Sequence, residues 1–263
     1  MADAARELIV EDDTHMRVLR LNRPERRNAL SSSLIRDLVA TLLSTASDRN
    51  VWAVVITGTG PDAFCSGMDL KEAHARNAET SADPNAVAAV SNFSPFEALR
   101  SLPMPTIAAI NGTAVAGGLE LALACDIRVC SSAARLGVPE VARGLVGNFA
   151  ATILPGLIPA SIAHELLFTA RPIDAETALR VGLVSQVVEP EEVLAAALAL
   201  GAQITANAPI AVRRTKARAR AGTMLPVESA YRLDLGPDPR DSRDRREGIA
   251  AFVEKRAPKW ENA

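Results

Sequence analysis

Within residues 111–126, Gly117, Gly118 and the carboxylate of Glu120 stand where a strand is expected to turn into a helix. An apolar run at 106–110 leads into Gly117 and Gly118, and Glu120 follows in the first turn of a predicted short apolar helix. A helix N-terminus carries unpaired backbone N–H groups and partial positive charge, and glycine has no side chain to keep a ligand away from them. The segment therefore suits a site that stabilises developing negative charge beside an ionisable acid or base. It equally suits a plain strand-to-helix turn with Glu120 in solvent, and this stretch alone leaves both interpretations open.

The composition is that of an ordinary globular protein. The chain has 263 residues, of which 48% are hydrophobic and 23% are charged, so it is long enough to bury a sizeable core. Its net charge of −2 gives no reason to expect nucleic acid or a membrane surface as a partner. No apolar run approaches the roughly 18 residues of a membrane span. The N-terminus is charged where a signal peptide needs an apolar segment, so we expect a cytoplasmic protein.

The cysteines and histidines do not form a metal-binding pattern. Cys65, Cys125 and Cys130 are odd in number and lack CxxC spacing, which favours reduced thiols that pack in the interior. The three histidines are isolated from one another in the sequence. We therefore expect no metal site.

Apolar patterning predicts an alternation of strands and helices followed by a mostly helical C-terminal third. We expect strands at residues 8–11, 15–22, 51–57, 106–110, 127–130, 134–136 and 184–188, and a short strand and loop at 63–70. We expect helices at 32–46, 96–102, 160–169, 174–181, 191–206, 209–221 and 243–255. Residues 71–92 show little periodicity and predict a loop with a weak helix.

A basic run lies within one of these predicted helices. It contains Arg213, Arg214, Lys216, Arg218 and Arg220. Such a run could contact nucleic acid, but the near-neutral net charge favours a solvated helix face.

Three separated segments together are similar to the enoyl-CoA hydratase (crotonase) family. Residues 63–71, 111–126 and 136–140 match the family's motifs in order and spacing, and the flanking segments 27–30 and 252–260 also fit. The resemblance extends over almost the whole chain. Agreement of several motifs in order is much more specific than any one of them.

The resemblance implies an α/β fold in which strand–strand–helix units form a spiral core over residues 1–190 with the acyl-CoA site. It implies that the helices of 191–263 form an oligomerisation region that assembles homotrimers, often paired into hexamers. The implied substrate is an acyl-CoA thioester, so that coenzyme A arrives as part of the substrate and no further cofactor is expected.

The family's functional positions map onto particular residues of this chain. The resemblance gives the two backbone donors of an oxyanion hole to Met68 and Gly117, the acid/base pair to Glu120 and Glu140, and a water-positioning backbone N–H to Asn148. It gives the contacts with CoA to Arg26, Arg27, Ser66, Asp69, Leu70 and Lys71.

These residues suit the hydration of a double bond conjugated to a thioester. Two backbone donors stabilise the enolate charge that builds on the carbonyl oxygen. One carboxylate takes a proton from water while a carboxylic acid supplies one, and repulsion between two nearby glutamates separates their pKa values. The sequence does not say which glutamate is the acid. We therefore expect an enoyl-CoA hydratase. The alternative within the family is an enoyl-CoA isomerase or another crotonase-family reaction, and the alternative of another class is a non-catalytic acyl-CoA-binding protein.

Two departures from the family pattern fall near this expected site. Ala116 stands where many members carry a third glycine. Residues 144–151 replace a stretch that is usually richer in glycine, and Phe149 within it is expected to narrow the acyl pocket.

Overall fold

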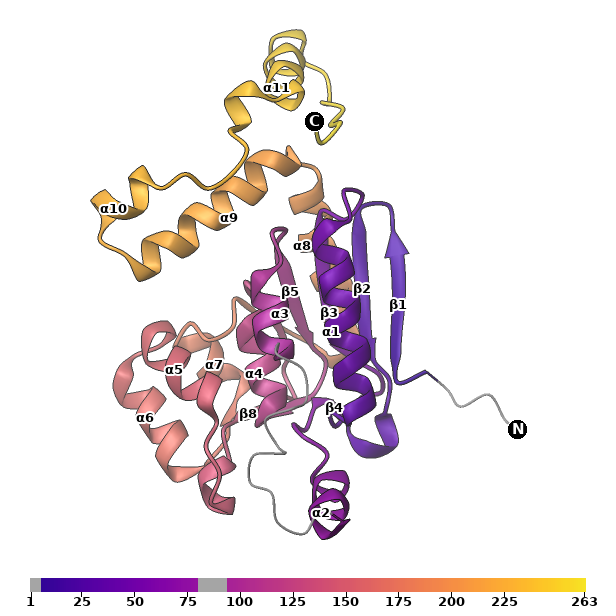
Figure 1. The fold of residues 1–263 in the computed structure, drawn as a ribbon, viewed down its shortest axis with the longest axis vertical. Helices are drawn as coiled ribbons and strands as arrows, with labels where there is room; N and C mark the ends of the chain where they lie inside the picture. Colours follow the sequence, from indigo (N-terminus) through magenta and orange to yellow (C-terminus); the bar gives the residue numbers. More distant parts are fainter. Residues whose placement is uncertain (1–5, 80–93) are drawn as a thin grey trace.

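The computed structural model describes residues 6–79 and 94–263 (Figure 1). Within these residues the strands form two sheets. The larger sheet has the order β1 (Leu8–Asp13), β2 (Met16–Leu21), β3 (Ala53–Gly58), β5 (Thr106–Ile110), β7 (Ile127–Ser131) and β10 (Gln186–Val188). The smaller sheet has the order β4 (Ala63–Cys65), β6 (Thr113–Val115), β8 (Arg135–Gly137) and β9 (Ile173–Asp174). The predicted α/β class is confirmed.

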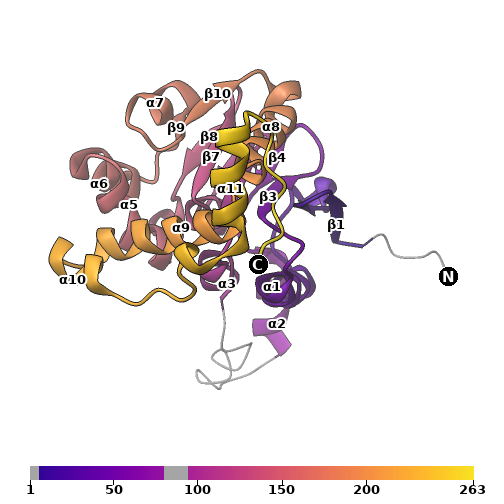
Figure 2. The same cartoon turned by 90° about the horizontal axis from the view of Figure 1, so that it is seen from above.

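Helices lie on both faces of the larger sheet and also beyond it. The helices of the described residues are α1 (Ser32–Ser47), α2 (Leu70–Glu79), α3 (Pro95–Ser101), α4 (Gly117–Ala124), α5 (Asn148–Leu157), α6 (Ala160–Thr169), α7 (Ala175–Arg180), α8 (Val193–Thr205), α9 (Pro209–Met224), α10 (Val227–Arg232) and α11 (Arg243–Glu254). Figure 2 shows α1 and α8 on opposite sides of the sheet. Along β3, Val54 and Ile56 join the large core cluster on the α1 side, whereas Val55 joins a second cluster with Val193 of α8. This alternation is the period of two that a strand buried on both faces requires.

The smaller sheet gathers the three motif segments at one place. β4 pairs with β6, and β6 with β8, in parallel register. The chain therefore leaves all three strands at the same edge, where it continues into residues 66–71, into α4 and into the 3-10 helix Glu140–Arg143. Segments that are far apart in sequence meet there.

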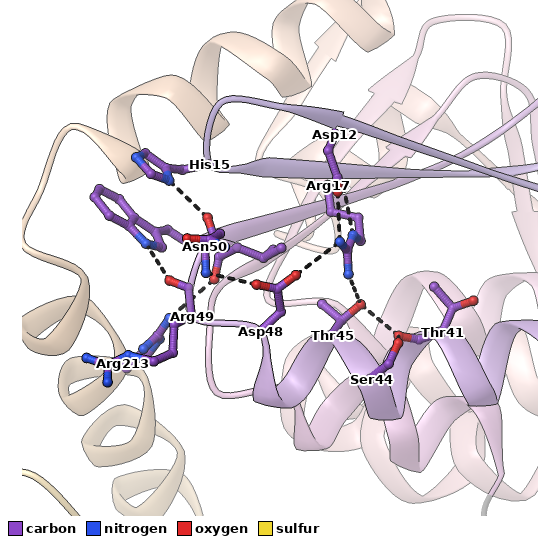
Figure 3. Close-up of polar contacts among 12 residues, drawn as sticks. Asp12, His15, Arg17, Thr41, Ser44, Thr45, Asp48, Arg49, Asn50 and Arg213 are labelled. Atoms are coloured by element: carbon purple, nitrogen blue, oxygen red, sulfur yellow. Dashed lines mark hydrogen bonds and ion pairs between the residues drawn. The ribbon is translucent and has the colours of Figure 1, made fainter. Parts of the chain in front are cut away.

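A polar network joins the C-terminal region to the loop after α1. Arg213 of α9 donates to the Val51 carbonyl (3.2 Å) and to Oδ1 of Asn262 (3.1 Å), while Asn262 donates to the Arg49 carbonyl (2.7 Å). Figure 3 shows this loop from Asp48 to Asn50 with Arg213 beside it. The loop is thus held by α9 and by the C-terminal segment, although α9 to α11 extend away from the sheets in Figure 1.

A second contact joins α9 to the same end of the sheet, where the parallel strands β5 and β7 begin. Lys216 Nζ lies 2.7 Å from Oδ2 of Asp126, and Arg220 donates to its Oδ1 (2.8 Å). The backbone N–H of Thr106 also donates to Oδ2 (2.8 Å). The Lys216 side chain is only 7% exposed. The prediction of a solvated helix face is therefore wrong for this lysine, because its long apolar stem packs inward and its charge meets a carboxylate.

Most predicted elements are present near their expected positions. α5 and α10 were not predicted, and α2 is a regular helix where only a weak one was expected. The remainder of the predicted loop, residues 80–92, lies outside the described residues. The division at residue 190 and the role of 191–263 in assembly stay predictions.

Within the described part of the chain, no single helix is both long and apolar enough to cross a membrane. The helices Pro190–Thr205 and Pro209–Met224 reach that length and composition only as a pair, with a bend of 107° between them.

Candidate active site

The turn between β6 and α4 brings two unused backbone donors together. Neither the N–H of Gly117 nor that of Met68 donates a hydrogen bond to any residue that the structure describes. The backbone of Leu30 fixes the position of the Met68 N–H by two hydrogen bonds, one on either side of Met68. The Leu30 carbonyl accepts the Asp69 N–H (3.0 Å), and the Leu30 N–H donates to the Gly67 carbonyl (2.8 Å). Unpaired N–H groups that are held rigidly are suited to bind an oxyanion.

Glycine is required where the segment after β4 touches this turn. Gly67 has φ +89°, and a Cβ on it would lie 2.7 Å from the Cβ of Ala116 and 3.1 Å from the nitrogen of Gly117. A Cβ on Gly118 would collide with the carbonyl oxygen of Cys65. The segment after β4 therefore contacts the start of α4 through backbone atoms. This close contact sets the distance between the N–H groups of Met68 and Gly117.

Ala116 itself has a backbone conformation that favours glycine. It is the N-cap of α4 with φ 54° and ψ −134°, and its side chain makes no capping hydrogen bond. A non-glycine residue held in such a region stores strain, typically about 1–3 kcal/mol. The family's preference for glycine here thus has a physical reason, and this chain departs from it at a cost.

Glu120 points inward from the first turn of α4. It is 7% exposed, and its Oε1 accepts the N–H of Ala150 (3.0 Å) at the start of α5. Burial raises the pKa of this carboxyl, while the backbone N–H groups of Ala150 and Phe149 oppose that rise. The interpretation of Glu120 as a solvated residue is therefore wrong.

Glu140 begins the 3-10 helix that follows β8 and is 9% exposed. Its Oε2 is buried and has no hydrogen-bond partner within the described residues. Burial raises the pKa of Glu140, and the charge of Glu120 raises it further. The second effect means that the two carboxyls lie within electrostatic range of each other. Gly147 leaves room for this group, since a Cβ there would lie 3.1 Å from Glu140 Oε1.

The two glutamates therefore differ in their surroundings although their types are identical. Backbone N–H groups of two other residues stabilise the ionised form of Glu120. Glu140 has its own backbone N–H as a donor, but its Oε2 has no partner among the described residues and the charge of Glu120 lies nearby. Such an environment keeps a carboxyl protonated near neutral pH more readily. One side chain can accept a proton while the other donates one.

The residues predicted to contact CoA form a group beside the turn between β6 and α4, which we call the oxyanion turn. Ser66 N–H donates to the Arg27 carbonyl (3.1 Å), and Ser66 Oγ donates to the Arg26 carbonyl (3.4 Å), so the two segments lie side by side. The side chains of Arg26, Arg27 and Lys71 are exposed. Leu70 and Lys71 open α2, with Leu70 also exposed.

Two of the predicted residues have more specific surroundings. Asp69 is engaged within the protein, because it pairs with Arg23 (3.0 Å) and accepts the N–H of Lys71 (3.2 Å). Its carboxylate therefore stabilises the conformation of the loop, and its negative charge does not attract a phosphate. Asn148 is exposed as the first residue of α5. It lies two residues before Ala150, whose N–H binds Glu120. This position fits the predicted water-positioning role, which stays a prediction.

Sequence reasoning missed the groups that support the glutamates. Ala150 and Gly147 carry no chemistry in their side chains, and they act by an N–H group and by an absent side chain. Only the unusual placement of Gly147 before a helix without a capping side chain could have pointed to them. Among the described residues, no cluster of three or more His, Cys, Asp or Glu side chains is placed to hold a metal ion.

Comparison with known proteins assigns the chain to a family. The model of the family described as enoyl-CoA hydratase/isomerase matches residues 11–263. The chain belongs to the enoyl-CoA hydratase/isomerase family. It is 40% identical over 258 residues to the putative enoyl-CoA hydratase/isomerase YngF of Bacillus subtilis (strain 168), with 95% of each chain covered. It is 35% identical over 252 residues to the short-chain-enoyl-CoA hydratase of Clostridium acetobutylicum, again with 95% of each covered.

The fold agrees with solved members of this enoyl-CoA hydratase/isomerase family. The crystal structure of an enoyl-CoA hydratase from Bacillus anthracis matches with a TM-score of 0.88 and 34% identity, covering 98% of this chain and all of that one (100%). The resemblance inferred from the three motif segments is confirmed, and so is the crotonase-type fold. Acyl-CoA thioesters are the substrates consistent with this family.

Proposed function

We propose that this protein is an enoyl-CoA hydratase, which adds water across the 2,3 double bond of a 2-enoyl-CoA thioester to give 3-hydroxyacyl-CoA. One observation carries the proposal. Two buried carboxyls, Glu120 and Glu140, are electrostatically coupled and differ in hydrogen bonding, and they lie beside a turn with two unused backbone donors. A hydration that needs one base, one acid and one oxyanion hole uses all four groups.

The N–H groups of Met68 and Gly117 would bind the thioester carbonyl oxygen. Their hydrogen bonds strengthen as negative charge moves onto that oxygen, and loss of one such donor typically costs about 3–4 kcal/mol of transition-state stabilisation. Polarisation of the carbonyl makes C3 of the conjugated double bond electrophilic.

Glu120 would act as the base and Glu140 as the acid. Ionised Glu120 removes a proton from water as the water oxygen bonds to C3, and the electron pair of the double bond moves into the enolate. Protonated Glu140 then gives its proton to C2, which restores the carbonyl. The N–H of Asn148 would orient the water. After one turnover Glu120 is protonated and Glu140 ionised, and a proton returned from one to the other through solvent resets the pair.

Other expectations belong to the same proposal. The CoA moiety would lie along the group formed by Arg26, Arg27 and Ser66, with Lys71 reaching a phosphate and the backbone of 69–70 in contact. No cofactor beyond the CoA of the substrate is expected. We also propose a cytoplasmic homotrimer or homohexamer whose subunits contact one another through residues 191–263.

Absorbance spectroscopy with crotonyl-CoA tests the proposal directly. Hydration removes the conjugated enoyl-thioester band, and the expected product is 3-hydroxybutyryl-CoA. An enoyl-CoA isomerase would leave crotonyl-CoA without water added and would convert a 3-enoyl-CoA into its 2-enoyl isomer. An unchanged spectrum for both substrates, with CoA thioester binding still measurable by calorimetry, would instead indicate a binding protein and would refute the proposed enzyme.

A further inference from the structure

Two phenylalanines from different helices meet next to the reacting groups. The rings of Phe96 on α3 and Phe149 on α5 have centroids 5.5 Å apart and planes tilted by 31°. Cζ of Phe96 lies 3.6 Å from the position of a Cβ on Gly117. Phe149 is the residue before Ala150, whose N–H binds Glu120. The two rings therefore extend from Gly117 in the oxyanion turn to the backbone segment that binds Glu120.

The backbones on both sides hold the aromatic pair in place. Both rings are partly buried and pack against the large core cluster. α3 begins with a complete capping box, in which Ser94 accepts from Glu97 N–H and the Glu97 side chain accepts from Ser94 N–H. Such a cap fixes the first turn of a helix, where Phe96 lies. α5 is fixed at its own first turn by the bond to Glu120.

We infer that the Phe96–Phe149 pair closes the acyl end of the site and restricts the substrate to short-chain 2-enoyl thioesters, an inference that rests on the proposed hydratase function. With the carbonyl oxygen at Gly117 and C3 beside Glu120, an acyl chain that continues past C3 meets the ring of Phe149. Two rings in contact leave no channel for methylene groups between them. Phe149 is thus a specificity-determining residue.

The test is a chain-length series with wild type and Phe149→Ala. The kcat/KM is measured for 2-enoyl-CoA thioesters of four, six, eight and ten carbons. A difference of one methylene in an apolar pocket changes kcat/KM by about 10–200-fold. We expect wild type to lose at least about tenfold between the four-carbon and eight-carbon substrates, and F149A to recover at least about tenfold for eight carbons while losing activity on four. Phe168→Ala is the matched control, because the Phe168 ring is 72% exposed on α6. It should keep the wild-type profile.

Two further measurements make the result decisive. Phe149→Leu keeps most of the packing and should shift the profile in the same direction by less, so a folding defect of F149A does not stop the test. Binding of butyryl-CoA and octanoyl-CoA, which cannot be hydrated, is measured by calorimetry for wild type and F149A. Tighter binding of butyryl-CoA to wild type, by at least about tenfold and abolished in F149A, would support the chain-length limit even if no enoyl-CoA were hydrated and the proposed function failed. Equal use of four and eight carbons by wild type, or a profile that neither variant at Phe149 alters, would overturn the inference.

Discussion

A partly buried aspartate at one end of the sheets and two buried glutamates at the other have opposite surroundings. Asp126, just before β7, is bonded by Lys216, Arg220 and Thr106. Burial raises its pKa, but the two cations outweigh that effect and hold the pKa below its ordinary value. Glu120 and Glu140 lie beyond β6 and β8, and burial raises their pKa values. The charge of Arg143 opposes this rise at Glu140 but does not outweigh it.

This difference distinguishes a carboxylate that stabilises the fold from carboxyls that are suited to proton transfer. A buried charge with all its hydrogen bonds made stabilises one arrangement of the chain, and breaking it leaves the partner charge buried and unpaired. A buried carboxyl with an unmade hydrogen bond costs free energy, and a protein retains it where proton transfer needs it. The amino end therefore holds α9 to the core, and the carboxyl end holds the two glutamates that we propose to transfer protons. Each of the following predictions tests one side of this contrast.

The largest effect should come from removing the titratable groups of the site. General acid–base catalysis contributes roughly 10²–10⁴-fold, so E120Q and E140Q should each lower kcat for crotonyl-CoA by at least about a hundredfold. The double variant should be little worse than the weaker single one, because residues that act together are not additive. Thermal unfolding should show no loss of stability. Glu176→Gln makes the same change at an exposed position of α7 and should retain full activity. Activity retained in both site variants would remove the glutamates from the mechanism.

Asp126→Asn should have the opposite effect, lowering stability while leaving activity nearly unchanged. It leaves Lys216 buried without its counter-charge, and breaking a buried ion pair typically costs about 3–5 kcal/mol. Because the Asp126 side chain is 23% exposed, we expect the lower end of that range, about 3 kcal/mol, in chemical denaturation. The kcat of the folded fraction should stay within about twofold of wild type. Asp241→Asn, on an exposed position, serves as the control. A D126N protein as stable as wild type would show that the ion pairs at the amino end do not hold the fold.

Ala116→Gly should stabilise the turn beside the site. Strain of about 1–3 kcal/mol at the positive φ is relieved, and the greater freedom of glycine in the unfolded chain takes back about 0.5–1 kcal/mol. The expected net gain is about 1 kcal/mol, seen as a melting temperature a few degrees higher. Activity should persist, because the N–H donors belong to the neighbouring residues. Gly144→Ala provides a comparison in the other direction, since it introduces a side chain at φ +68° where the space is open. A destabilised A116G would mean that the methyl group packs well enough to outweigh the strain.

The smallest effect concerns the pH dependence of stability. The folded-state pKa of Glu140 is raised above 4.5, so the folded protein binds more protons than the unfolded chain in the pH range just above 4.5. Stability therefore falls as the pH rises through that range, and E140Q should escape this loss. Relative to wild type, the melting temperature of E140Q should improve from pH 5 to pH 8. Glu247→Gln should show a constant difference over that range, because a hydrogen bond from Arg256 holds the Glu247 pKa at about 2. A constant difference for E140Q as well would contradict the raised pKa.

Local patterns were enough to predict most of the fold. The apolar run 51–57 predicted a strand that is indeed buried, and the predicted helix at 32–46 is present as α1, where Ser31 caps the first turn by accepting the Leu34 N–H at 3.0 Å. These signals depend on neighbours in the sequence. The motif resemblance then indicated the family and the pair Glu120 and Glu140, which residue patterns alone did not separate from a solvated carboxylate.

The missed features depend on partners far along the chain. α5 has no capping side chain at Gly147 and contains Pro155, so its sequence argues against a helix. Its first N–H groups are instead satisfied by Glu120, 30 residues earlier. The basic run on α9 looked solvated for a similar reason, because Asp126 lies 94 residues before Arg220. No local pattern contains such information.

The buried cysteine beneath the oxyanion turn has a consequence for thioester chemistry. The Cys65 carbonyl touches the α4 backbone at Gly118, so its sulfur belongs to a residue next to the position proposed for an activated acyl group. A thiolate there would compete with water by taking the acyl group from CoA. Burial raises the pKa of Cys65 to about 12, which leaves about one thiol in 10⁵ ionised at pH 7. A thioester bound at the proposed position would therefore not lose its acyl group to this sulfur.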